Sequence, residues 1–155
     1  MQVGNNSLEV ILASSTAALA AQVFKLLWYR LKGKPVNFRI LTQTGGMPSS
    51  HSASMMGMAT SVGLINGFDS TLFAVALGIS LVVMYDAAGL RRAAGSMAGI
   101  LNKITEDIYS DKPGQIPERL RELLGHTPVE VLVGAFLGAG IAYAYHVHLM
   151  AKGAL

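Results

Sequence analysis

Four long apolar segments constrain the fold of this chain more than any other feature. In the 155-residue sequence they cover residues 8–29, 49–66, 70–91 and 128–150. A helix needs about 20 mostly apolar residues to cross a bilayer, and each segment comes close to this length or exceeds it. Charged residues make up only 14% of the chain, too few to cover the large relative surface of a small water-soluble protein. We therefore predict an all-α, polytopic membrane bundle with about four transmembrane helices.

The connections between these segments differ in length and character. Residues 67–69 are few enough for a tight hairpin, whereas residues 94–127 form a long polar stretch. Between Met97 and Ile108 the apolar residues of this stretch recur at helical spacing, which predicts an amphipathic helix on the membrane surface or against the bundle. Prolines end this pattern, and a short helix over residues 118–124 is expected after them.

The lysines and arginines are distributed unevenly across the predicted membrane. With four crossings, Lys152 alone falls on the side of the termini, Lys25 lies just inside the opposite boundary, and the other basic residues lie beyond it. These others are Arg30, Lys32, Lys34, Arg39, Arg91, Arg92, Lys103, Lys112, Arg119 and Arg121. Because basic loops tend to stay in the cytoplasm, we predict cytoplasmic connections and external termini. The protein would then be integral to a bacterial plasma membrane or an organelle membrane.

The composition argues against several other classes of protein. The chain has no cysteine, so it can form neither a disulfide framework nor a thiolate metal site. Its net charge of +3 is too small to indicate nucleic-acid binding. No basic residue precedes the first apolar segment, so residues 1–7 do not resemble the start of a cleaved signal peptide. The length suits one domain, residues 1–155.

Side chains capable of chemistry gather at one face of the predicted membrane. They come from all four apolar segments and one loop: Lys25, Arg39, His51, Arg91, Arg92, His126 and Glu130. Ionisable groups near the hydrocarbon region are costly and usually functional, so this convergence predicts a shared site. The lysines and arginines could instead be interfacial anchors that reach toward headgroups, but this explains the two histidines less well.

The segment over residues 44–53 suits the start of a helix near an anion. Gly45 and Gly46 permit an unusual turn, Pro48 fits a helix start, and Ser49 or the next serine can cap the helix. Free backbone N–H groups at a helix start attract phosphate, and His51 in the first turn can exchange a proton near neutral pH. Taken alone, the segment is explained better as a loop with a helix cap.

A second informative segment contains a histidine and a glutamate four residues apart. Glu130 can reach a ring nitrogen of His126, which would fix the tautomer and leave the other nitrogen nucleophilic. The alternative is a capping box, in which Glu130 reaches back to the N–H of Thr127. We expect that one carboxylate oxygen cannot fill both roles fully. Further along, Gly134 and Gly138 would let another helix approach closely, unless they reflect ordinary glycine content.

These segments resemble motifs of a known superfamily. Type 2 phosphatidic acid phosphatases and vanadium haloperoxidases carry a Pro-Ser-Gly-His motif, which resembles Pro48-Ser49-Ser50-His51. Their third motif resembles His126-x-x-x-Glu130-Val131-x-x-Gly134. Over roughly residues 20–140 the chain is similar to the divergent bacterial and plant branch, including the stretch over residues 84–93.

The resemblance implies a membrane phosphatase that acts on a lipid phosphate or pyrophosphate without a metal or cofactor. His126 would form a phosphohistidine, Glu130 would orient it, and His51 would protonate the departing alkoxide. The implied phosphate-binding residues are Lys25, Arg39, Arg91, Arg92, Ser49 and Ser50, with Asp86 and Tyr85 as further candidates. The implied partners are the lipid substrate and membrane lipids, with no nucleic acid, and a homo-oligomer is compatible with the sequence.

The chain departs from the family pattern at several positions. Ser50 replaces Gly, Glu130 replaces Asp, and Leu120 stands where the family has an Arg. Arg91 or Arg92 would have to replace that Arg, and Arg92 is favoured because it shares a helix face with Tyr85 and Gly89. Lys25 and Arg39 would substitute for the first motif.

Two other functions stay open at this point. One is a non-catalytic membrane protein that binds anionic lipid or a partner. The other is a small transporter that uses Asp86, His51 and Glu130 as a relay.

Overall fold

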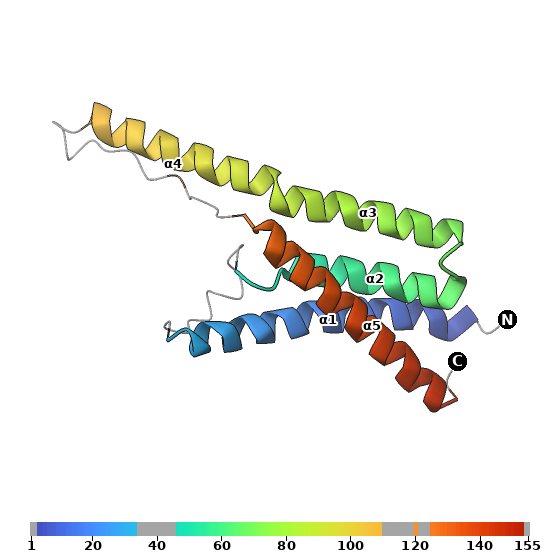
Figure 1. The fold of residues 1–155 in the computed structure, drawn as a ribbon. Coiled ribbons are helices and arrows are strands. Elements are labelled where there is room, and N and C mark those ends of the chain that lie inside the picture. The colour runs from blue at the N-terminus through green and yellow to red at the C-terminus, as the bar shows by residue number, and fades with distance from the viewer. Residues whose placement is uncertain (1–2, 34–45, 110–119, 121–124, 154–155) are drawn as a thin grey trace.

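The computed structural model describes residues 3–33, 46–109, 120 and 125–153. These residues form helices and contain no strand, which confirms the all-α prediction. The helices are α1 (Val3–Leu31), α2 (Ser50–Asn66), α3 (Thr71–Ala88), α4 (Leu90–Ile108) and α5 (Pro128–Ala151). The chain direction alternates through α1, α2, α3 and α5, so both termini lie at one end of the bundle (Figure 1).

The shortest helix, α2, lies at the centre of the bundle and packs against α1, α3 and α5. Its buried residues are small: Ser52, Ala53, Gly57, Ala59, Ser61 and Gly63. Lipid tails are as apolar as leucine, so helices in a membrane gain cohesion from close approach rather than from burial of large apolar side chains. The small residues of α2 supply this close approach.

Two glycines of α5 bring its backbone onto α2, as their spacing predicted. A Cβ atom at Gly138 would overlap the carbonyl group of Ala53, and one at Gly134 would overlap the carbonyl oxygen of Ser49. Any larger side chain would therefore push the two helices apart. These contacts place the start of α5 beside the start of α2.

The buried face of α1 repeats every fourth residue. It consists of Glu9, Ala13, Ala17, Ala21 and Lys25, each at most 2% exposed. Large apolar side chains cover the outer faces instead, including Leu19 of α1, Val82 of α3 and Phe136 of α5, which are 66%, 70% and 77% exposed. Such an apolar exterior suits lipid as the surrounding medium.

Three parts of the described chain are long and apolar enough to cross a membrane: Ser7–Leu31, Thr71–Ile108 and Pro128–Ala151. With 17 residues, α2 is shorter than the roughly 20 residues that a full crossing needs. The protein is thus a membrane helix bundle with three spans of full length around a shorter central helix. The hairpin predicted between the second and third apolar segments is present between Asn66 and Thr71.

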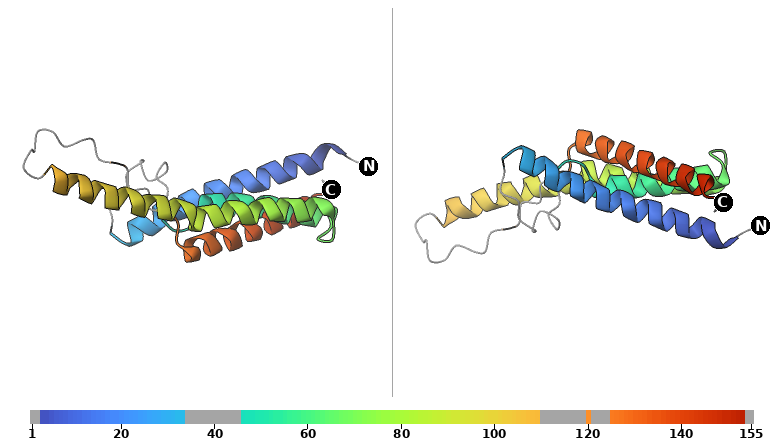
Figure 2. Two further views of the ribbon diagram at one scale, coloured as in Figure 1. Left: turned by 90° about the horizontal axis from the view of Figure 1, so that it is seen from above. Right: turned by 90° about the horizontal axis from the view of Figure 1, so that it is seen from below.

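The third apolar segment and the amphipathic helix are joined more closely than predicted. Only Gly89 separates α3 from α4, so the amphipathic helix begins at Leu90 rather than near Met97. No proline follows Gly89 to stop the helix, and the two helices run nearly end to end, with α4 extending beyond the others (Figure 2). The helix expected over residues 118–124 lies outside the described residues except for Leu120, which is not helical.

Candidate functional site

His126 is held just before α5, between α3 and the first turn of its own helix. Its backbone N–H donates to the carbonyl oxygen of Ala87 at 3.1 Å. Its ring Nδ1 lies 3.3 Å from Oε2 of Glu130. The residue is 5% exposed, so both backbone and ring are fixed in a mostly enclosed position. A carboxylate only accepts hydrogen bonds, so Nδ1 carries the hydrogen in this contact and Nε2 keeps its lone pair.

Glu130 also closes the helix cap that the sequence suggested as an alternative. Its Oε2 accepts the backbone N–H of Thr127 at 3.0 Å, and Thr127 Oγ1 accepts the backbone N–H of Glu130 at 3.3 Å. Our expectation that one oxygen could not serve both roles was therefore wrong. A carboxylate oxygen can accept two hydrogen bonds, one along each lone pair. Because His126 directly precedes the N-cap residue Thr127, its ring and the backbone N–H of Thr127 both reach Oε2 of Glu130.

The start of α2 is tied to the start of α5. The backbone N–H of Ser49 donates to the carbonyl oxygen of Glu130 at 3.1 Å. Ser49 caps α2, because its Oγ accepts the backbone N–H of Ser52 at 3.3 Å and the hydroxyl of Ser52 at 3.0 Å. Ser49 is fully buried and its hydroxyl is engaged in this cap, and its predicted contact with phosphate stays a prediction. Ser50, partly exposed, stays a candidate for that contact.

The turn before α2 lies directly on Lys25 of α1. A Cβ atom at Gly46 would lie 2.9 Å from Cε of Lys25 and 3.4 Å from the hydroxyl of Tyr29. Gly46 also has a φ of +87°, a conformation that favours glycine. Both constraints explain why a glycine occupies this position. Lys25 itself is 2% exposed, so its ammonium group is brought into the protein rather than into bulk solvent.

The electrostatics of His126 place the other predicted residues near it. Burial lowers the pKa of His126 below its ordinary value of 6.5. The hydrogen bond and the negative charge of Glu130 raise this pKa, whereas the positive charges of Lys25 and His51 lower it. Such effects are appreciable only between nearby groups. In the geometry, the turn before α2 contacts Lys25, and Ser49 at the start of α2 bonds the backbone of Glu130. With its pKa lowered, His126 is neutral near pH 7.

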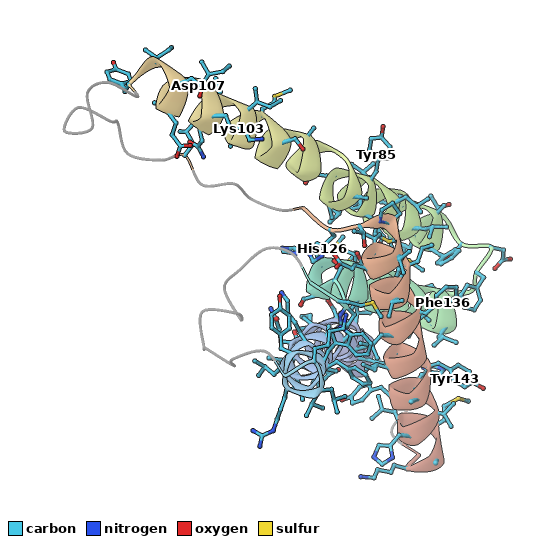
Figure 3. All side chains as sticks on the ribbon, turned by 60° about the vertical axis from the view of Figure 1, so that its left-hand side comes forward. Tyr85, Lys103, Asp107, His126, Phe136 and Tyr143 are labelled. Carbon is cyan, nitrogen blue, oxygen red and sulfur yellow. The ribbon has the colours of Figure 1, made fainter. Side chains whose placement is uncertain are left out.

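The remaining predicted residues divide into two groups. Arg39 lies outside the described residues, and Arg91 and Arg92 belong to the first turn of α4, where only the backbone is described. Asp86 is partly exposed near the end of α3. Tyr85 is 81% exposed and points away from His126, so it does not belong to the site (Figure 3).

The position of Tyr85 has a simple geometric cause. Ala87 is 5% exposed and so faces the bundle, and a residue two positions earlier on a helix points to nearly the opposite side. We favoured Arg92 over Arg91 as the phosphate-binding residue because Arg92 shares a helix face with Tyr85. Since Tyr85 points outward, this reason no longer separates the two arginines.

A side-chain clamp missed by the sequence analysis holds the segment before His126. Asn102 of α4 donates from Nδ2 to the carbonyl oxygen of Leu120 and accepts the N–H of Leu120 at Oδ1, both at 2.9 Å. Asn102 is 6% exposed. Leu120, which stands where the resemblance would have an Arg, takes part in this contact through its backbone. The spacing puts Asn102 outside the apolar stripe of its helix, so no signal in the sequence pointed to this contact.

A second histidine–glutamate pair, also missed, lies toward the terminal end of the bundle. Nδ1 of His146 in α5 is 2.8 Å from Oε1 of Glu9 in α1. Glu9 is 1% exposed. Its position on the same four-residue repeat as Lys25 was a signal that it faces inward. Among the residues that the structure describes, no three His, Asp or Glu side chains are grouped so as to hold a metal ion.

Comparisons with known proteins agree with this architecture. The model of the Divergent PAP2 family matches residues 6–141, which include both motif segments. YuiD, an uncharacterized membrane protein of Bacillus subtilis (strain 168), is 38% identical, and the match covers 83% of this chain and 87% of that protein. No solved structure is significantly similar to the chain. The chain therefore belongs to the Divergent PAP2 family of membrane proteins.

Proposed function

We propose that this protein is a metal-independent membrane phosphatase that hydrolyses a lipid phosphate or pyrophosphate through a phosphohistidine. One observation carries the proposal: a buried, neutral His126 is oriented by Glu130 at Nδ1, with Lys25 and His51 close enough to shift its pKa. A nucleophile, an orienting carboxylate, a cation and a proton donor are the groups that phosphoryl transfer requires.

The first step transfers the phosphoryl group to the protein. Nε2 of His126 attacks phosphorus, the bond from phosphorus to the ester oxygen breaks, and protonated His51 gives its proton to the departing alkoxide. Glu130 stabilises the positive charge that develops on the ring of His126. The ammonium group of Lys25 stabilises the non-bridging phosphate oxygens.

The second step restores the protein. A water molecule gives a proton to His51 and attacks phosphorus, and the bond from phosphorus to Nε2 of His126 breaks. Inorganic phosphate leaves, His126 regains its lone pair, and His51 is protonated for the next cycle. The sum of both steps is hydrolysis of one phosphate ester by one water molecule.

Phosphate release by the purified protein tests this proposal. Phosphatidic acid, phosphatidylglycerophosphate and a polyprenyl phosphate would be offered in detergent micelles. We expect His126→Ala to lower kcat by more than about 10³-fold, because it removes the nucleophile. His148→Ala is the matched control, since His148 is exposed near the other end of α5. Equal inactivity of wild type and His126→Ala on all three lipids would refute the proposal.

One observation favours a second candidate, a lipid-binding protein without turnover. The position at which the resemblance calls for an Arg is occupied by Leu120, whose side chain is 51% exposed. A site with fewer cations would still bind an anionic headgroup but would stabilise the transition state less. Binding of phosphatidic acid to vesicle-embedded protein without any phosphate release would favour this alternative.

The orientation in the membrane belongs to the same proposal. From the uneven distribution of basic residues we infer that the site faces the cytoplasm. Because the chain has no cysteine, Ser7→Cys and Ser110→Cys can be labelled without background. An impermeant thiol reagent applied to intact cells should label Ser7→Cys alone, and labelling of Ser110→Cys would reverse the orientation.

A further inference from the structure

An apolar cavity of about 420 Å³ lies between α1, α5 and the turn that precedes α2. Six of the side chains that line it are Phe24, Trp28, Pro48, Val133, Phe136 and Leu137. This volume lies within the range of sites that hold small molecules, roughly 300–1,000 Å³. Figure 3 shows Phe136 on the same helix that His126 precedes, further from the site end.

Several residues that line the cavity are close in the chain to residues of the candidate site. Phe24 precedes Lys25, Pro48 precedes Ser49, and Val133 lies one helical turn beyond Glu130. Each of the three elements that supply the site therefore also supplies a wall of the cavity. A ligand whose anionic group reached Lys25 would have its other end beside these walls.

The chemistry of the lining limits what the cavity can hold. The lining side chains are mostly hydrocarbon, and the indole N–H of Trp28 is the one strong hydrogen-bond donor among them, so the cavity favours an apolar ligand. Phe24 and Phe136 are 56% and 77% exposed, so the cavity opens at the outer surface of the bundle. That surface is the one that suits lipid, from which a hydrocarbon chain can enter sideways.

We propose that this cavity holds one hydrocarbon chain of the phosphorylated lipid whose headgroup occupies the His126 site. The inference rests on the proposed function and adds the place where the substrate's apolar part is bound. Because lipid tails are as apolar as the lining, the cavity adds little affinity by burial. Its effect is to orient the chain and thereby align phosphorus with His126.

Substitution of one lining residue tests the effect on turnover. Val133→Trp fills the cavity, and Val82→Trp on the outer face of α3 is the matched control. For long-chain phosphatidic acid we expect Val133→Trp to lower kcat/KM about tenfold. A water-soluble short-chain analogue should be hydrolysed by both variants within about twofold of wild type. Equal losses on both substrates, or no loss on either, would overturn the inference.

Photo-cross-linking supplies a readout that does not require activity. A phosphatidic acid with a photoreactive group in the middle of one chain should label Phe136 and Leu137 in vesicles of phosphatidylcholine. Unlabelled phosphatidic acid should reduce the labelling, whereas additional phosphatidylcholine should not. Equal competition by both lipids would make the cavity an ordinary lipid-facing surface and overturn the inference. If the wild type released no phosphate, the proposed phosphatase would fail, while selective labelling would still support the chain-binding cavity.

Discussion

Two histidine–glutamate pairs stand near opposite ends of α5, and they differ in distance along the chain and in access. His126 and Glu130 are separated by 3.3 Å and lie within one helical turn, with the Glu130 side chain 19% exposed. His146 and Glu9 are separated by 2.8 Å and join α5 to α1, with the Glu9 side chain fully enclosed. The rings show the reverse order, with His126 7% and His146 13% exposed, so the pairs differ in exposure mainly at the carboxylate. The first pair lies within one helical turn, whereas the second joins two helices.

The surroundings of the two pairs differ as well. Lys25 and His51 act electrostatically on His126. At the other pair, Oε2 of Glu9 is buried without a hydrogen-bond partner among the residues described. A charge at this depth is costly unless it is well paired. Under the proposed function, the same two residue types would serve catalysis at one end of the bundle and helix–helix cohesion at the other.

The largest expected contrast is in catalysis. Glu130→Ala should lower kcat by about 10²–10⁴-fold, because His126 loses the group that fixes its tautomer. Glu9→Ala should keep kcat within about threefold of wild type at temperatures where it is folded. Phosphate release in detergent micelles measures both. If the two variants lost activity equally, the distinction between the pairs would be lost.

The next contrast is in stability. Glu9→Ala should lower the free energy of unfolding by about 1–3 kcal/mol, since it breaks a tie between α1 and α5 and leaves His146 unpaired. Thermal unfolding in detergent would report the change, with Asp107→Ala on the exposed side of α4 as control. The double variant Glu9→Ala/His146→Ala should lose less than the sum of the single losses. If the double variant lost as much stability as the two single variants together, Glu9 and His146 would have no interaction energy.

The smallest expected effect is a shift in pH dependence. His126 must be neutral to attack, and its pKa lies below 6.5, so kcat/KM should rise with pH through a value below 6.5. Glu130→Gln should move this limb to lower pH, because Glu130 raises the pKa of His126. Lys25→Met should move it to higher pH, because Lys25 lowers that pKa, each by less than about one unit. Shifts in the same direction would contradict the arrangement of charges around His126.

Interactions within one helical turn could be predicted from the sequence. The Thr127–Glu130 cap and the approach of Glu130 to His126 depend only on helix geometry and residue spacing. The apolar segments likewise predicted helices, since the membrane requires internal backbone hydrogen bonding. Gly134 and Gly138 correctly indicated close helix contact, because two glycines four residues apart leave one helix face without side chains that would keep another helix away.

Features that depend on helix rotation and packing could not be predicted in this way. Tyr85 was a further candidate for the site, but the rotation of α3 turns it outward. The Glu9–His146 pair depends on how α1 crosses α5, which no local pattern specifies. The Asn102 clamp on Leu120 similarly depends on where the chain returns after α4.

The length of α2 has a consequence for the bilayer itself. At 1.5 Å per residue, its 17 residues span about 25 Å, less than the roughly 30 Å of a typical hydrocarbon layer. This hydrophobic mismatch requires local thinning of the lipid or leaves one end of α2 below the headgroup plane. Local thinning would bring the phosphate of the proposed lipid substrate level with His51 at the first turn of α2, whereas a helix end below the headgroup plane would require that phosphate to move into the membrane. Membrane thickness would therefore act as a physical control on access, independent of any change in the protein.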